Sequence, residues 1–406
     1  MRKVIAISVV FVLAVGAAFA QVSGTIDARF VLAENDGTED ADTFIGGGGS
    51  GVADGYLTLS GQDPDGKFGG LVRIRANENG GNFHRAFAWW RPIQQVKIFL
   101  GHDLDGLFGT DPLTAWGFHQ GGESFVERHD WDFWRMVFPG NWDGFGAAFS
   151  FYFVQGLEIN LVIPTGLPEW YPGEGDKAGQ ALTYGQLLDS LRLQVNYAIP
   201  DIGKIFVSWI GGRQDIIDDD LKDGVVNYGQ IGGSFLLTAV EGLQLQIGVS
   251  TYLYNADNLG KFDNGNDQVA PLAIGLAAHF ASGDFGVKFR SAFVLNAYAA
   301  NQTTADSWKY RAWNNWYPFV EGTLITFNVM PWYNLGVLTA YLDIGADIAA
   351  PEGADESPVY IWINPYIRKS IGPGAIRAGV MIGIDDDGVN DAVISLKIPV
   401  QFTFSF

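Results

Sequence analysis

Hydrophobic and polar side chains alternate with a period of two along most of this chain. The pattern is clearest at the end, where the apolar side chains are Ile394, Leu396, Ile398, Val400, Phe402, Phe404 and Phe406. Polar side chains fill the positions between them, except at Pro399, which predicts a bulge because proline cannot donate a ladder hydrogen bond. Such alternation predicts β-strands with one apolar and one polar face.

The same alternation recurs in earlier segments, at residues 22–30, 191–197, 243–250, 285–290 and 376–384. Gly, Pro, Asn and Asp separate these segments, and no long stretch has a helical period. We therefore predict an all-β protein. Alternation alone does not say which face contacts water, so a soluble β-sandwich stays open at this point.

The connections favour a transmembrane antiparallel up-and-down β-barrel. From residue 188 onward, tight turns are predicted at 200–203, 241–242, 282–284, 331–334 and 372–374. Long polar loops are predicted between them, at 211–227, 254–270, 296–318, 347–358 and 385–391. If the C-terminus is periplasmic, all the tight turns lie on one side and all the long loops on the other, as in outer-membrane barrels.

The candidate strands number about nineteen, which conflicts with the even number expected of a bacterial barrel. One assignment between residues 101 and 165 must be wrong, because 139–141 and 155–156 cannot both be periplasmic turns. We predict about 18 strands, with 16 as the next choice. The mature chain then has about 21 residues for each strand and its connection.

The first 20 residues have the pattern of a cleavable secretory signal. Arg2 and Lys3 precede an apolar run from Val4 to Val15, and Ala18-Phe19-Ala20 forms a small-residue cleavage site. An uncleaved anchor is the alternative, but the run is shorter than a membrane-spanning helix requires. Residues 21–406 are then expected to form a single barrel domain, and no later run is long and apolar enough for a transmembrane helix.

Composition excludes several classes of protein. Aromatic residues make up 14% of the chain and charged residues only 17%, which is the opposite of a disordered protein. The formal net charge of −20 argues against nucleic acid as a partner. The chain has no cysteine, so disulfide scaffolds, thiolate zinc sites and cysteine nucleophiles are excluded, which suits an oxidising envelope compartment.

Aromatic residues lie where a membrane protein would place them. Trp209 and Trp362 fall within predicted strands, and several others fall near predicted strand ends, where interfacial girdles form. These are Trp142, Trp313, Trp316, Tyr317, Trp332 and Tyr333. Aromatics of a soluble core are the alternative for any single member, but the whole set favours a membrane barrel.

The signal ending in Ala18-Phe19-Ala20 and the alternating strand closing on Phe406 resemble those of bacterial outer-membrane β-barrel proteins of the porin type. The resemblance implies that Phe402, Phe404 and Phe406 are read by the barrel-assembly machinery and that the barrel sits in outer-membrane lipid. Porin-like barrels are often trimers, so the resemblance also implies a homotrimer. Only the terminal signature is specific, and no subfamily follows from it.

Basic residues within strands fall mainly on the polar face, which lines the lumen of a barrel. The candidates for a basic pore lining are Arg29, Arg73, Arg75, Lys97, Arg192, Lys288, Arg290 and Arg377, with Lys204 and Lys397 on the same face. Many acidic residues lie in connections, at 34–42, 215–220 and 385–387. A cationic bore beneath an acidic vestibule is therefore one prediction, and solvated lumen charges without a selective role are the other.

Residues 101–130 form a long connection that mixes apolar residues with Asp103, Asp105 and Asp111. In general porins the third loop folds into the bore and places an acidic edge opposite a basic ladder. The resemblance implies the same for these three aspartates opposite Arg73, Arg75 and Lys97. A loop packed on the rim or on a neighbouring subunit is the alternative.

No catalytic or metal site emerges from the motifs. His102, His119 and His129 lie near Glu123, Glu127 and Asp130, but their spacing matches no metal-site pattern. The sequences 63–66 and 263–267 have the Asp, Asn and Gly of calcium loops without the EF-hand spacing, so we predict turns. Residues 46–51 lack the lysine of a P-loop and are predicted to be a flexible outer loop. Neither G-x-S-x-G nor H-E-x-x-H occurs, so we expect no enzyme, metal or cofactor.

Two functions follow as hypotheses. The first is a water-filled channel through which small hydrophilic solutes and ions diffuse passively, because a polar face lines a closed barrel. The second is a surface adhesin or ligand-binding barrel that acts through its long acidic extracellular loops. An envelope hydrolase would need a catalytic set that the sequence does not show.

Overall fold

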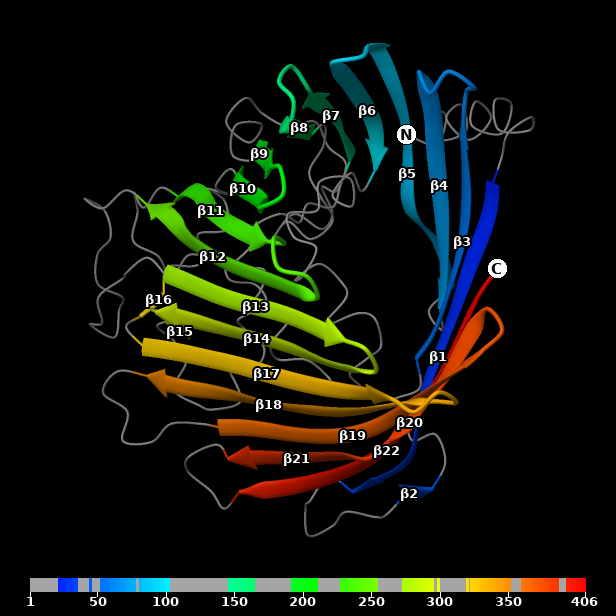
Figure 1. Ribbon diagram of the computed structural model, residues 1–406, viewed down its shortest axis with the longest axis vertical. Coiled ribbons are helices and arrows are strands. Elements are labelled where there is room, and N and C mark those ends of the chain that lie inside the picture. The colour runs from blue at the N-terminus through cyan, green and yellow to red at the C-terminus, as the bar shows by residue number, and fades with distance from the viewer. Residues whose placement is uncertain are drawn as a thin grey trace.

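The protein is an antiparallel β-barrel in a computed structural model (Figure 1). The structure describes residues 21–35, 44–45, 52–77, 80–102, 145–164, 191–210, 227–254, 272–295, 298–299, 319–320, 322–351, 359–386 and 392–406. Within these ranges the chain forms strands and tight turns and contains no α-helix. None of these residues belongs to a helix long and apolar enough to cross a membrane.

The first half of the barrel consists of β1 (Gln21–Asn35), β3 (Val52–Gln62), β4 (Phe68–Asn77), β5 (Gly80–Ile93), β6 (Val96–His102), β7 (Phe145–Phe151), β8 (Leu157–Pro164), β9 (Arg192–Ile199) and β10 (Gly203–Ile210). The second half consists of β11 (Asn227–Leu237), β12 (Leu243–Tyr254), β13 (Leu272–Ser282), β14 (Phe285–Leu295), β17 (Gly322–Asn334), β18 (Thr339–Pro351), β19 (Val359–Ile371), β20 (Gly374–Gly379), β21 (Met381–Asp386) and β22 (Val393–Ser405). The short strand β2 (Phe44–Ile45) pairs with β1, and β15 (Tyr298–Ala299) pairs with β16 (Phe319–Val320) in a separate sheet.

Each strand pairs with the next along the chain, and β22 pairs with β1 to close the barrel. The sheet has twenty labelled strands, but β2 is only a two-residue strand paired with the end of β1, and β20 and β21 are two parts of one strand between β19 and β22. The barrel therefore has 18 strands, which confirms the predicted fold class and the even number.

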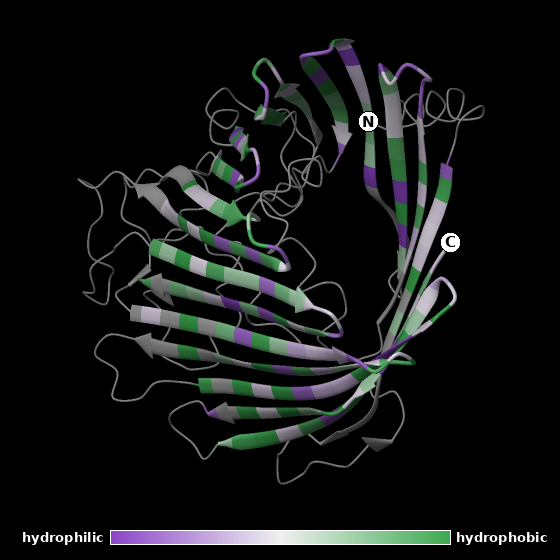
Figure 2. Cartoon of the chain, in the orientation of Figure 1, coloured by the Kyte–Doolittle hydropathy of each residue, from purple (hydrophilic) through white to green (hydrophobic). Residues whose placement is uncertain are grey.

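The period-two alternation of the sequence becomes two faces of the barrel wall, and the alternation is visible along the strands in Figure 2. Ser150, Asn160, Gln194 and Ser208 lie opposite one another across four strands, and all four are buried. Neighbours on the other face are half-buried or exposed, with Leu193 and Val207 among the exposed ones. Because a closed barrel crowds side chains on its concave side, the buried polar face is the inner one.

Most of the predicted tight turns are confirmed. The strands β9 and β10 are joined at 200–202, β13 and β14 at 283–284, and β19 and β20 at 372–373. Of the two competing turns at 139–141 and 155–156, the second is present, because residues 155–156 lie in the turn between β7 and β8. Gly156 has a φ of 79°, and the amide of Leu157 donates to the carbonyl oxygen of Val154 at 3.0 Å. Residues 139–141 lie outside the described ranges.

The turn predicted at residues 331–334 is wrong. These residues belong to β17, and their ladder with β14 runs on to the pair of Tyr333 with Phe285. The turn follows at 335–338, where the side chain of Asn334 accepts from the amide of Gly336, whose φ is 82°. Proline and asparagine favour turns, but the pairing with β14 extends the strand as far as Asn334.

The bulge predicted at Pro399 lies in the partner strand instead, because three steps along β1, from Val31 to Glu34, match two along β22, from Pro399 to Lys397. The register between β1 and β22 shifts between Val31 and Glu34, opposite this part of β22. On the other side, β20 and β21 meet at Val380, whose amide donates to the carbonyl oxygen of Pro365. The proline is thus accommodated where the ladders on both sides are irregular.

Candidate functional site

The inner wall of the barrel is polar and rich in cations. Its fully or nearly buried polar residues include Ser150, Asn160, Gln194, Asn196, Ser208, Ser234, Gln246, Asn328, Asn364 and Gln401. Their alternation with outward apolar residues leaves the amide and hydroxyl groups facing the lumen. Gln246 and Ser234 form one of the cross-strand contacts of this wall, with Nε2 donating to Oγ at 3.0 Å.

The described strands place most of the predicted basic residues at inward positions. Register rows put Arg73, Arg75, Lys97, Arg192, Lys204, Lys288, Arg290, Arg377 and Lys397 on the same face as the buried polar residues. Arg29 lies opposite Gln401 in the pairing of β1 with β22. Register rows put acidic positions on the same face as well, among them 27, 54, 158, 343, 347 and 385, so basic positions outnumber acidic ones on the described strands.

The strands β3, β4 and β5 carry one cluster of cations. Arg73 pairs with Thr58 on one side, where its Nε donates to the Thr58 hydroxyl at 3.1 Å, and with Arg85 on the other. The guanidinium carbons of Arg73 and Arg75 lie 5.9 and 5.8 Å from the centre of the Tyr56 ring. Three guanidinium groups are thereby concentrated on neighbouring strands, a geometry suited to attracting anions.

An apolar patch on the inner wall adjoins this cluster. Phe87, Phe99, Ala148 and Val162 are buried together on β5 to β8, and Leu71 and Trp89 pack against them. The Lys97 ammonium lies 4.1 Å from the centre of the Trp89 ring and 4.6 Å from that of Phe99. The lysine therefore sits over aromatic faces at the edge of the patch.

A buried aspartate lies on the opposite part of the wall, in β18. Asp343 Oδ1 accepts from Asn328 Nδ2 and, at 3.4 Å, from the indole nitrogen of Trp362. Asn364 is paired with Asp343 in the ladder, is fully buried, and has neither amide atom hydrogen-bonded. Arg290 pairs with Asn328 one row away, so an acid and a cation share this inner surface.

Glu158, in β8, is an acidic residue of the inner wall and lies near the tight turn between β7 and β8. It accepts from Asn160 Nδ2 at 3.3 Å and from the hydroxyl of Tyr152, in the turn after β7, at 3.4 Å. Burial raises the pKa of the Tyr152 phenol, so the hydroxyl stays protonated and able to donate.

Three of the predicted arginines are more enclosed than a solvated lumen charge would be. Arg192, Arg290 and Arg377 expose less than a tenth of their surface, whereas Arg73, Arg75, Lys97 and Lys288 are half-buried. Arg377 Nη1 donates to Gln401 Oε1 at 2.7 Å across β20 and β22. The inner wall therefore has an enclosed set of cations and a more accessible set.

Sequence reasoning missed several inner-wall residues. Arg85 and Asp343 are not among the predicted site residues, and the sequence predicts Trp332 and Trp362 only as aromatics in or near strands. The structure places both tryptophans inward, on rows with Gly286 and Gly345. The spacing along β19 was the available signal. Trp362 lies an even number of residues from Asn364 and Arg368, and residues so spaced on a strand face the same side.

The predicted acidic edge at Asp103, Asp105 and Asp111 lies outside the described residues, as do His119, His129 and their neighbouring acids. His102 is in β6. No group of three or more possible metal ligands occurs among the residues that the structure describes.

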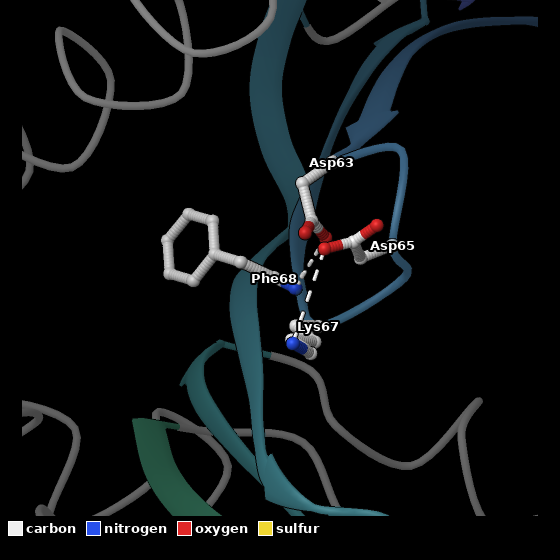
Figure 3. A network of polar contacts seen from close by, with 4 residues as sticks. All are labelled: Asp63, Asp65, Lys67 and Phe68. Carbon is white, nitrogen blue, oxygen red and sulfur yellow. Dashed lines mark hydrogen bonds and ion pairs between the residues drawn. The ribbon is translucent and has the colours of Figure 1, made fainter.

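The sequence 63–66 forms a turn, as predicted (Figure 3). Asp63 Oδ1 accepts from the amide of Phe68 at 2.6 Å, and its carbonyl oxygen accepts from Gly66, whose φ is 64°. The neighbouring pair of Lys67 and Asp65, 3.9 Å apart, is exposed and contributes little to stability. Residues 263–267 and 46–51 are not among those described.

Aromatic side chains at the tight-turn end point outward. Trp90, Phe153, Tyr197, Phe285 and Tyr333 are all exposed, and the rings of Phe151 and Phe153 stack 5.9 Å apart. Such a band is typical of the interfacial girdle of a membrane barrel. Phe402, Phe404 and Phe406 also face outward and are exposed. Trp142, Trp313, Trp316 and Tyr317 lie outside the described ranges.

A closed 18-strand barrel with an apolar outside and a polar, cationic inside defines a fold of the outer-membrane porin type. Solved structures of Pseudomonas aeruginosa proteins share this fold. OpdL aligns with a TM-score of 0.53 at 11% identity over 96% of this chain and 99% of its own, and OpdQ with 0.52 at 9% over 96% and 97%. OprD aligns with 0.51 at 10% over 95% of both chains. No family model and no curated protein matches the sequence.

Proposed function

We propose that this protein is an outer-membrane porin whose water-filled channel lets small hydrophilic solutes and ions diffuse passively, with a preference for anions. One observation carries the proposal, namely a closed barrel whose inner face is polar and cationic while its outer face is apolar. The similarity in fold to OprD, an outer-membrane porin, supports the same class.

The physical argument begins with the barrel wall. Lipid cannot hydrogen-bond an open sheet edge, so the closed ladder from β1 to β22 suits a membrane. A barrel of this size leaves room for water beyond what the inward side chains fill. Passive diffusion then needs no catalytic residue, and we propose no enzymatic step.

The anion preference follows from where the charges lie. The chain as a whole carries a formal charge of −20, yet the inner wall is rich in arginine and lysine. Rings or ladders of these residues lower the free energy of an anion in a pore relative to a cation. The half-buried Arg73 and Arg75, beside Tyr56, are the cations best placed to act on a passing solute.

The test is the single-channel conductance and reversal potential of the purified protein in a planar bilayer under a salt gradient. Stable conductance steps with a reversal potential of the anion-selective sign are expected. Replacing both Arg73→Ala and Arg75→Ala should shift the reversal potential toward cations, whereas Arg73→Lys with Arg75→Lys, which keeps both charges, should leave it near the wild-type value. A folded barrel that never conducts would contradict the channel and favour a binding function of the outer loops.

A further inference from the structure

The inward tryptophans of the described strands share one geometry. Trp89, Trp332 and Trp362 each lie directly opposite a glycine on the neighbouring strand, and the pairs are completed by Gly69, Gly286 and Gly345. The tryptophans that point outward on these strands, Trp90 and Trp209, have Phe68 and Leu193 among their partners instead.

Each indole occupies the space that a side chain at its glycine would need. A Cβ at position 69 would lie 2.6 Å from Cζ2 of Trp89, one at position 286 would lie 2.5 Å from Nε1 of Trp332, and one at position 345 would lie 2.6 Å from Cη2 of Trp362. Carbon atoms in contact are separated by about 3.5–4.0 Å. The indoles therefore lie across the neighbouring strand instead of standing out from the wall, as strand side chains usually do.

We infer that these tryptophan and glycine pairs set the calibre of the channel, and that Trp89 and Trp332 are residues that determine its size limit. The inference rests on the channel function proposed above. A tryptophan folded against the wall leaves a wider passage than one that projects into it, and only glycine opposite permits the folded position. Trp362 is buried beside Met381, so the half-buried Trp89 and Trp332 are the members that a solute can meet.

The surroundings of the two indoles agree with a role at the lumen surface. The Lys97 ammonium lies over the Trp89 ring, so a flat indole keeps that charge close to the wall. Trp332 belongs to a row that continues through Tyr341 and Tyr366. The two tyrosine rings stack 4.7 Å apart at an interplanar angle of 2°, and the row ends on Gly379. Glycine inside a strand weakens the strand, so the glycines at the two ends of this row, Gly286 and Gly379, need a physical reason. The width of the passage supplies one.

The experiment compares Gly69→Ala and Gly286→Ala with the wild type by single-channel conductance and by liposome permeation of neutral solutes of increasing size. Neutral solutes separate a change of calibre from a change of charge. We expect each variant to lose conductance and to exclude solutes that the wild type admits, because the displaced indole narrows the passage. Trp89→Ala should have the opposite effect. Gly55→Ala is the matched control, since that glycine faces outward and its Cβ would meet only the Ala76 carbonyl oxygen at 3.7 Å.

Folded glycine variants with wild-type conductance and size limit would overturn the inference while leaving the channel intact. If Gly286→Ala does not fold, the double variant Gly286→Ala with Trp332→Ala decides the question, because the three atoms nearest to the added Cβ all belong to Trp332. That double variant should fold and admit larger solutes than the wild type, and an unchanged size limit would again overturn the inference. A wild-type barrel without conductance would overturn the channel function itself, and this inference with it.

Discussion

Phe406 closes the barrel on Gly24. The two residues exchange main-chain hydrogen bonds, with the Gly24 amide donating at 2.8 Å and the Phe406 amide donating at 2.9 Å. The Phe406 ring lies over the Gly24 Cα, where a Cβ would come within 2.6 Å of Cε1 and 2.8 Å of Cε2. The last residue of the chain therefore seals the seam between β22 and β1 on a position that carries no side chain.

Gly24→Ala should impair closure of the barrel. The added methyl group forces the Phe406 ring away, and overpacking of this kind costs about 1–3 kcal/mol of folding free energy. Refolding of the urea-denatured protein into detergent micelles, followed by heat-modifiable gel mobility, would measure the folded fraction without the assembly machinery. Gly55→Ala is the control, because its surroundings are open. Equal folded fractions for both variants would show that the ring over Gly24 does not matter for closure.

Gln401→Leu should destabilise the barrel by removing the acceptor of a buried arginine. Arg377 is buried, and its Nη1 donates to Gln401 Oε1 at 2.7 Å. Loss of a hydrogen bond to a charged group costs about 1.5–3 kcal/mol, more if the guanidinium is left without another partner. Urea titration in micelles gives the free energy of unfolding. Gln401→Glu keeps an acceptor at the same place, so a loss as large as that of Gln401→Leu would contradict the assignment.

Asp343→Leu should remove the acceptor shared by two buried donors. Asn328 Nδ2 and Trp362 Nε1 both donate to Asp343 Oδ1, but Asn328 Nδ2 also donates to the Ile344 carbonyl oxygen at 3.1 Å. The loss therefore falls mainly on the Trp362 indole, and an unsatisfied buried donor costs about 1–3 kcal/mol. The fluorescence of Trp362 should change as its indole loses the bond. Asp343→Asn retains Oδ1 and should cost less, while it removes a negative charge from the wall and shifts the reversal potential further toward anions. A larger loss of stability in Asp343→Asn than in Asp343→Leu would argue against the shared acceptor.

Asp201→Gly should stabilise the turn between β9 and β10. Asp201 has a φ of 61°, a left-handed conformation that is unfavourable for residues with a Cβ. Relief of this strain is expected to add about 0.5–1 kcal/mol to the free energy of unfolding. Gly283→Ala makes the reverse change in the turn between β13 and β14, where φ is 59° and the added Cβ meets nothing within 4 Å. Thermal unfolding of the two variants should shift in opposite directions.

Local pattern was enough to predict much of the architecture. The alternation around Gln401 and Phe402 indicated which side chains face the lumen and which face outward, because a strand points successive side chains to opposite faces. The glycines of the tight turns gave most of the connections and, with the even-number rule, the strand count. The turn predicted at Trp332 and Tyr333 is wrong because pairing with β14 extends β17 through residues that are common in turns.

The sequence by itself determined the all-β class and predicted about 18 strands with basic residues on the polar face, since these depend on residue types at a period of two. Only the tertiary structure decided which side chains meet across the wall. Gly24 meets Phe406 because the barrel closes, and Trp89 lies over Gly69 because the ladder register sets them opposite each other. The burial of Arg377 likewise follows from the curvature of the closed wall and its contact with Gln401. Register and closure join residues far apart in the chain, and no local pattern carries that information.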